Sequence, residues 1–280
     1  MSAQRPSGQP LLVVIDPAAR DMDGESVRIA KDVLCGGAPS VKIALPQSEE
    51  EAVRVLEHRG RRRPVVVGDD AALLRTVRAL HSARGLGEAV VGLVPVGRRT
   101  GLARALGVPG GAVNAARAVL DGAERELDLL LDDSGGIVLG ALRIGSAMPA
   151  WWTPVERRAR SLARTLSLNG HSPHLGLGLR GGHRLRVEAD GVVLADLDDC
   201  VEEVSVSTAV SGLAEVLVRR EGVTPALPVR ARSVTVSGRD FRYTADTAPA
   251  GPVRRRTWTV APAAWRLTVP RSAAARRAAG

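Results

Sequence analysis

Two short segments combine glycine with charged residues just behind apolar runs, where a phosphate group could bind. Their members are Gly68, Asp69 and Asp70 in the first turn, and Gly97, Arg98, Arg99 and Thr100 in the second turn. A glycine-containing turn between a strand and a helix lets backbone N–H groups approach phosphate oxygens, and the helix start favours an anion. Arginine adds bidentate contacts to phosphate. The two turns are therefore candidate cofactor-binding segments.

The charges in these turns allow two opposite interpretations. Asp69 would repel a triphosphate, because like charges held close together are unfavourable. Arg98 and Arg99 could bind the phosphates themselves, or they could pair with the two aspartates and close the cleft. The sequence is compatible with both arrangements.

The first half of the chain alternates strand and helix patterns around these turns. Short apolar runs bounded by turn residues are typical of strands buried on both faces, and they occupy residues 11–15, 41–45, 64–67 and 89–94. Helical periodicity marks residues 26–34, 49–58, 71–81 and 111–120. Such alternation predicts a parallel sheet with right-handed crossovers.

The second half has a different pattern, in which short stretches alternate in polarity between glycine-rich or proline-rich breaks. These stretches are residues 184–188, 201–206, 232–236, 256–260 and 266–269. The pattern predicts an antiparallel sandwich or barrel. A turn cluster at 132–136 suggests the boundary. We therefore predict an α/β domain over 1–133, a β-sandwich over 134–270 and a frayed tail over 271–280.

The order of these segments resembles the catalytic domain of bacterial diacylglycerol kinases and their sphingosine kinase relatives. In that family one strand leads into Gly-Gly-Asp-Gly-Thr, and a later strand leads into Pro-Leu-Gly-Thr-Gly-Asn-Asp. An Ala-Arg-x-Leu-Gly-Ile-Pro-like stretch follows, and residues 103–109 read Ala-Arg-Ala-Leu-Gly-Val-Pro here. The resemblance covers essentially the whole chain. It implies a Rossmann-like parallel-sheet nucleotide-binding domain followed by an antiparallel β-sandwich.

This chain departs from the family pattern where the family contacts phosphate. Gly68, Asp70 and Gly97 match the two motifs. The substituted positions are occupied by Asp69, Ala71, Ala72, Arg98, Arg99, Thr100 and Gly101. Phosphoryl transfer depends on positioning and on neutralising charge, so these changes argue against an efficient kinase of the usual kind.

The second domain carries the remaining residues that the resemblance implies. Glu215 keeps an acid in the stretch that the family associates with magnesium, although the leading aspartates are missing. Ala248 aligns with the family's proposed general base and cannot accept a proton. Asp246, two residues earlier, could replace it as the catalytic base.

Two functions from different classes follow. The first is a lipid kinase that uses ATP and Mg²⁺ to phosphorylate a lipid hydroxyl. The second is a non-catalytic descendant, a pseudokinase that binds an anionic lipid or a nucleotide as a regulatory module. The expected partners are a lipid substrate or an anionic membrane surface, and the sequence is compatible with a homodimer without specifying the oligomeric state. A small anionic substrate, as in related polyphosphate and NAD kinases, fits the second half less well.

The composition of the chain limits the partners and the location that we expect for it. Aromatic residues make up 2% of the chain, too few for the stacking platform that single-stranded nucleic acid needs, so we expect no nucleic-acid partner. The net charge of +9 favours anionic surfaces. Cys35 and Cys200 form no disulfide or zinc pattern, and the chain starts without an apolar signal core. We expect a cytoplasmic protein that could associate peripherally with the inner face of the membrane.

A helix is predicted inside the second half, over residues 153–166. Thr153, Pro154 and Glu156 provide its capping signals, and Trp151 and Trp152 precede it. Its basic amphipathic pattern fits a helix lying on a membrane. It equally fits a helix packed on the sandwich with a solvated basic face.

Overall fold

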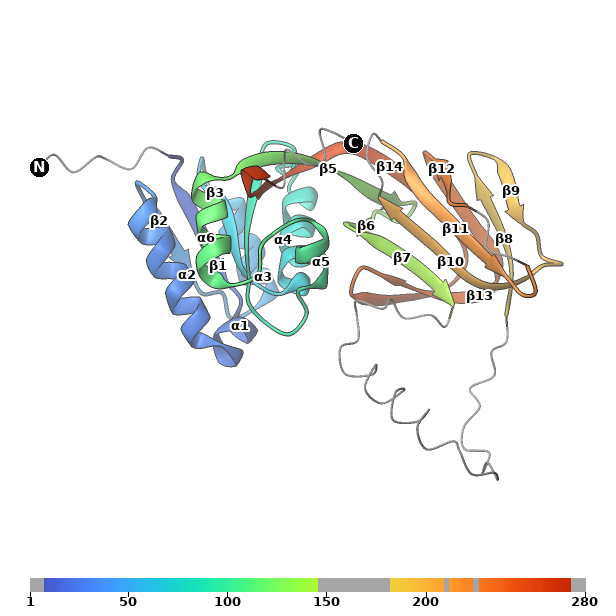
Figure 1. Cartoon of the computed structure of the whole chain (residues 1–280), viewed down its shortest axis with the longest axis horizontal. Coiled ribbons are helices and arrows are strands. Elements are labelled where there is room, and N and C mark those ends of the chain that lie inside the picture. Colours follow the sequence, from blue (N-terminus) through green and yellow to red (C-terminus); the bar gives the residue numbers. More distant parts are fainter. Residues whose placement is uncertain (1–7, 146–181, 209–211, 224–226, 273–280) are drawn as a thin grey trace, which may run out of the picture.

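The computed structural model describes residues 8–145, 182–208, 212–223 and 227–272, and it is a mixed α/β fold in which strands predominate (Figure 1). Four strands of the first half pair in parallel in the order β4-β3-β1-β2. They are β1 (Leu11–Ile15), β2 (Val41–Ala44), β3 (Arg63–Gly68) and β4 (Val90–Pro95). Aliphatic runs suit such strands because helices cover both faces of the sheet. These strands coincide with the four apolar runs of the sequence.

Six helices connect or follow these strands. They are α1 (Pro17–Met22), α2 (Gly24–Gly37), α3 (Glu49–Glu57), α4 (Asp70–Ser82), α5 (Gly101–Ala105) and α6 (Ala112–Asp121). The helix α2 packs against α6, and α3 packs against α4. Right-handed crossovers in this strand order place the two pairs on opposite faces of the sheet. The carboxyl ends of β1 and β3 therefore meet where the connections change direction, which is where ligands bind in open α/β sheets.

The second unit is built from antiparallel strands. They are β5 (Ala123–Asp132), β6 (Ile137–Val138), β7 (Ala141–Gly145), β8 (His183–Ala189), β9 (Val192–Ala195), β10 (Cys200–Thr208), β11 (Ala214–Arg220), β12 (Val229–Ala231), β13 (Ser233–Ala245) and β14 (Ala248–Val269). Their inward side chains form a second core around Trp258, Phe241 and Tyr243. The rings of Tyr243 and Trp258 meet edge to face, with centroids 5.2 Å apart.

The long strand β14 joins the two units. It pairs antiparallel with β13 and β5, and its last part pairs in parallel with β4 through Arg266 and Leu267. Trp258 packs in the second core, whereas Trp265 and Val269 pack in the first core. The chain therefore returns to the first unit at its end, and a linear division near residue 134 does not describe the cores. Residues 256–260 and 266–269, predicted as separate strands, are parts of this one strand (Figure 1).

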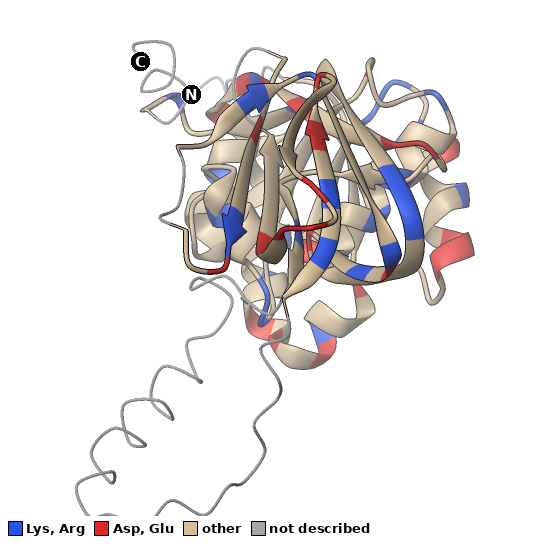
Figure 2. Cartoon of the chain, turned by 90° about the vertical axis from the view of Figure 1, so that its right-hand side faces the viewer, with Lys and Arg blue, Asp and Glu red and all other residues tan. Residues whose placement is uncertain are grey.

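Some predicted segments lie outside the described residues. These are the helix predicted over 153–166 with Trp151 and Trp152, and most of the predicted tail. Within the described ranges, every helix is too short or too polar to cross a lipid bilayer. Figure 2 shows that basic and acidic residues are interspersed over the strands of the second unit on the side in view.

Candidate functional site

The structure brings the first and second turns together at the carboxyl edge of the parallel sheet. Gly68 at the end of β3 is in register with Pro95 at the end of β4. The backbone N–H of Val96 donates to the carbonyl of Gly68 at 3.0 Å, and the N–H of Asp70 donates to the carbonyl of Arg99 at 2.8 Å. The two turns therefore form one structural site, as the sequence order predicted.

Two glycines allow this close approach. A Cβ on Gly68 would lie 2.6 Å from the Cβ of Ala72. Gly97 has a φ of +130°, and a Cβ there would lie 3.0 Å from the Cβ of Asp69. Both positions therefore need glycine for packing of the turns, whether or not a phosphate binds.

Asp69 fills the anion position at the start of α4. It is the N-cap residue of this helix, and its Oδ1 accepts hydrogen bonds from the N–H groups of Ala71 at 3.0 Å and Ala72 at 3.1 Å. Such N–H groups are unpaired within a helix, and they are the donors that a bound phosphate uses. The carboxylate therefore stands where a phosphate oxygen would stand in a glycine-rich turn.

Asp70 accepts backbone N–H groups at the start of the helix α5. Its side chain is buried, and its oxygens accept hydrogen bonds from the N–H groups of Leu102 and Ala103, both at 2.9 Å. These donors belong to the first turn of α5, whose N-cap residue Thr100 makes no side-chain capping bond. Burial raises the pKa of Asp70, and the backbone N–H groups of Ala103 and Leu102 act in the opposite direction.

Arg98 and Arg99 do not pair with these aspartates. Both side chains are exposed, and within the described part of the chain neither forms an ion pair. Of the two arrangements that the sequence allows, closure of the cleft by aspartate–arginine pairs is not found among the described residues, because backbone N–H groups, and not guanidinium groups, satisfy Asp69 and Asp70. Binding of an anion by Arg98 and Arg99 stays a prediction.

Asp246 lies in the turn between β13 and β14, with a φ of +50°. Its carboxylate accepts hydrogen bonds from the N–H groups of Leu139 at 2.8 Å, Gly140 at 2.7 Å and Ala141 at 3.3 Å. Burial raises the pKa of Asp246, and these three N–H groups act against the rise. Gly140, one of these donors, packs against α5, because a Cβ on Gly140 would lie 2.7 Å from Leu102 Cδ1.

Glu215 lies far from the two turns in the strand order. It is on β11, and four strands lie between β11 and β4 in the sheet. Its carboxylate is 3.4 Å from the guanidinium of Arg230 on the neighbouring strand β12. Over the described ranges, no three acidic, histidine or cysteine side chains gather as a metal site would require.

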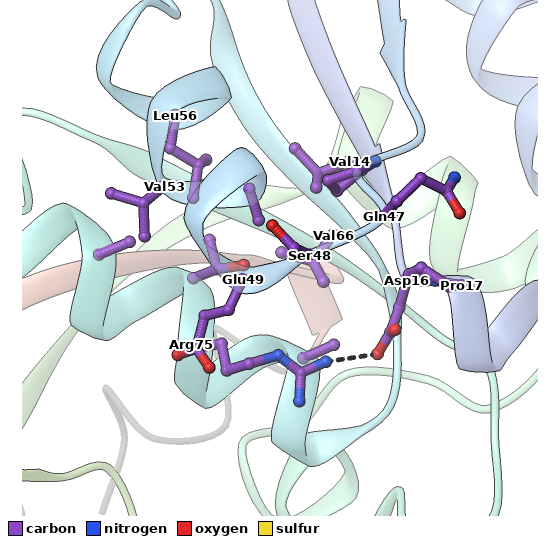
Figure 3. Close-up of a pocket in the computed structure, with 15 residues that line it drawn as sticks. Val14, Asp16, Pro17, Gln47, Ser48, Glu49, Val53, Leu56, Val66 and Arg75 are labelled. Carbon is purple, nitrogen blue, oxygen red and sulfur yellow. Dashed lines mark hydrogen bonds and ion pairs between the residues drawn. The ribbon is translucent and has the colours of Figure 1, made fainter.

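A cavity of about 270 Å³ lies between β1, β3, α3 and α4 (Figure 3). The ion pair between Asp16 Oδ2 and Arg75, 2.7 Å long, borders it, and Ser48 and Glu49 line it from the start of α3 (Figure 3). None of these four residues was predicted to be part of a site from the sequence. Ser48 followed by Glu51 is a capping box that could have marked the start of α3, whereas nothing local marks Arg75.

Comparison with solved structures identifies the fold. Two structures from Bacillus anthracis str. Sterne, each named a "putative diacylglycerol kinase", superpose with TM-scores of 0.68 and 0.69 at 13% and 14% identity. The matches cover 93% and 95% of this chain, and 97% and 98% of the other chains. A further structure from this organism, named a diacylglycerol kinase, has a TM-score of 0.68 at 13% identity and covers 95% and 98% of the two chains.

The chain therefore has the diacylglycerol kinase-like fold over nearly its whole length. This agrees with the resemblance in its sequence. No protein-family model matches the chain. A search of curated proteins finds no match either.

Proposed function

We propose that this chain is a diacylglycerol kinase-like protein in which ATP-dependent phosphorylation of a lipid hydroxyl is weak or lost, and that it acts as a non-catalytic binding module. One observation carries the proposal. Asp69, which replaces a glycine of the family motif, accepts two backbone N–H bonds at the start of α4, beside the sheet edge. The donors that would hold a phosphate are already used.

Repulsion between the Asp69 carboxylate and a bound phosphate is large enough to weaken the binding of ATP. Two unit charges about 5 Å apart at an effective dielectric constant of about 20 repel by ~3 kcal/mol. That repulsion corresponds to a loss of roughly 100-fold in affinity. A triphosphate at this edge would also have to displace a carboxylate that already has good partners. We therefore expect ATP to bind poorly in the orientation that transfer requires.

The contacts of Asp246, the candidate general base, also support weak or lost phosphoryl transfer. A general base must reach the substrate hydroxyl within hydrogen-bond distance and must have a free lone pair. Asp246 is buried and already accepts three backbone N–H groups. We propose that its role is to hold the β13–β14 turn against residues 139–141. If transfer persists, ATP and Mg²⁺ are its cofactors, and Asp246 is the acid available to this turn.

A second candidate function has a specific observation in its favour. Arg98 and Arg99 are exposed and carry no ion pair in the described residues, so their guanidinium groups are available to an anion. An anionic membrane surface or a lipid phosphate is the partner that this pair would bind. Flotation with vesicles containing anionic lipid, for the wild type and for Arg98→Ala/Arg99→Ala, tests it. Equal flotation with neutral vesicles would reject it.

The main proposal is tested by a transfer assay. Purified full-length protein is incubated with labelled ATP, Mg²⁺ and diacylglycerol, or other lipids with a free hydroxyl, in mixed micelles. We expect no lipid phosphorylation above the level of a reaction without protein. ATP-dependent lipid phosphorylation by the wild type at the rate of an efficient kinase would overturn the proposal.

A further inference from the structure

The outer face of the antiparallel unit carries two arginines on neighbouring strands that could share one anion. We propose that Arg143 on β7 and Arg242 on β13 bind a phosphate monoester group between them, over the backbone of Gly145. These residues belong to other elements than Arg98 and Arg99, and the inference holds whether or not the chain transfers phosphate.

Both arginines point away from the second core. Leu142 and Ile144, the neighbours of Arg143 on its strand, are buried in that core, and so are both neighbours of Arg242. Successive side chains of a strand point to opposite faces, so the two arginines stand on the outer face. Arg143 is in register with Thr244, which makes Arg242 its diagonal neighbour. Diagonal neighbours have Cβ atoms within ~7–8 Å of each other, a separation that lets two long side chains hold one phosphate.

Arg242 has a glycine beside it on each neighbouring strand. Tyr243 is in register with Ile144, so the same antiparallel pairing brings Gly145 of β7 opposite Arg242. On β14, a Cβ at Gly251 would lie 3.3 Å from the Cα of Arg242. Glycine offers no side chain to cover or to pair with the guanidinium, which is exposed and forms no ion pair within the described ranges. The space over Gly145, between the two arginines, is therefore open to an anion.

A buried carboxylate holds Arg143 in place. Glu203 on β10 is 6% exposed, and its two oxygens lie 2.8 Å from Arg143 and 3.1 Å from Arg219. Arg219 also lies 3.9 Å from Glu202. Three guanidinium groups therefore face two carboxylates, and the excess positive charge lies at Arg242. Arg143 bonds Glu203 through Nη1 and has further N–H donors for an anion, and a side chain already oriented loses less freedom on binding.

Charge and donor geometry favour a phosphate monoester over other anions. Such a group carries about two negative charges at neutral pH, and its three oxygens can accept from both guanidinium groups. A carboxylate brings one charge and two oxygens. Ser205 and Thr244 flank Arg143 on the neighbouring strands, so their hydroxyl groups lie on the same face as the site. Phosphorylated metabolites and lipid head groups both supply this chemistry.

Calorimetric titration of the full-length protein with glycerol 3-phosphate at constant ionic strength tests the site. We expect the wild type to bind, and Arg242→Ala to bind about tenfold more weakly, because charge-assisted hydrogen bonds are lost. Arg242→Lys keeps the charge without the planar fork and should be intermediate.

The matched control is Arg255→Ala. Arg255 lies on β14, is exposed, and likewise forms no ion pair in the part of the chain that the structure describes. Its removal takes the same charge from the neighbouring strand, and binding should stay at the wild-type level.

Flotation separates the two sources of the phosphate. Phosphatidylcholine vesicles are compared with and without phosphatidic acid, whose head group is a phosphate monoester. Flotation that requires both phosphatidic acid and Arg242 assigns the site to a lipid head group. Binding of glycerol 3-phosphate without flotation assigns it to a phosphorylated metabolite. Arg98→Ala/Arg99→Ala is measured in parallel, so that any contribution of the second turn is counted separately.

Two results would overturn the inference. One is that neither glycerol 3-phosphate, up to about 10 mM, nor phosphatidic acid vesicles bind. The other is an equal loss of binding in Arg242→Ala and Arg255→Ala, which would show a general attraction of anions to a basic surface.

The wild type provides a test that needs no variant. Phenylglyoxal modifies accessible arginines, and mass spectrometry locates the modified residues. Bound glycerol 3-phosphate should protect Arg242 and leave Arg255 reactive, and equal modification of Arg242 with and without the ligand would contradict the site. Circular dichroism checks the folding of each variant, and this measurement decides if Arg242→Ala does not fold.

Discussion

Removing the Asp70 carboxylate should destabilise the first unit strongly, because this group holds the start of α5. Asp70 is 2% exposed, and its two oxygens accept the N–H groups of Leu102 and Ala103 at 2.9 Å. In Asp70→Ala both donors lose their acceptor, and each buried donor left unpaired costs ~1–3 kcal/mol. Relief of a buried carboxylate offsets part of that loss. We expect a net decrease of ~2–4 kcal/mol in the free energy of unfolding.

The matched control is Asp70→Asn, which keeps one acceptor oxygen at nearly the same volume. It should lose roughly half as much as Asp70→Ala, since only one of the two N–H bonds remains. Urea unfolding followed by tryptophan fluorescence measures both, because Trp265 is fully buried in the first core and Trp258 in the second. A loss below ~1 kcal/mol in Asp70→Ala, or equal losses in the two variants, would refute the capping role of Asp70.

Further predictions concern the other buried groups. Burial raises the pKa of Asp70 and Asp246 above the ordinary 3.8, so their ionisation opposes folding. Stability from these groups is fully present below pH 3.8 and is lost as pH rises through the raised pKa values. Asp246→Asn should flatten this part of the pH profile of unfolding, and an unchanged profile would contradict it. Asp246→Ala should lower stability by ~2–4 kcal/mol in urea unfolding, because three N–H groups lose an acceptor. Arg75→Ala should cost ~1–3 kcal/mol, since Asp16, whose side chain is 10% exposed, is left without its ion pair; a thermal melt identical to wild type would count against that ion pair.

The first unit was predictable because its signals are local. The run 11–15 is aliphatic throughout and ends at Asp16-Pro17, and β1 has these bounds. Asp69 before α4 is an N-cap residue of the preferred type, so its bonds to the helix start were also readable from local sequence. The alternative in which Asp69 pairs with arginine did not consider the nearer backbone N–H groups of Ala71 and Ala72.

The remaining features depend on contacts between distant parts of the chain. Asp70 accepts the N–H groups of Leu102 and Ala103, which lie 32 and 33 residues further along the chain. No local sequence pattern therefore reveals these two hydrogen bonds. The continuity of β14 was hidden by the break at residues 261–264, where its pairing with β5 shifts register. The return of Trp265 to the first core likewise depends on strand pairing with β4 and β5, which sequence alternation alone does not specify.

Under the proposed function, Asp69 in the first turn takes the place of a bound phosphate while the fold is kept. A helix start with unpaired N–H groups is stabilised by an anion, and that anion can be a bound phosphate or an internal carboxylate. Asp69 and Asp70 supply internal acceptors to the starts of α4 and α5, so the two turns hold together without a ligand. These hydrogen bonds contribute to the stability of the free protein. Fold and activity can therefore separate at this site, because a side-chain acceptor satisfies a helix start as well as a bound anion does.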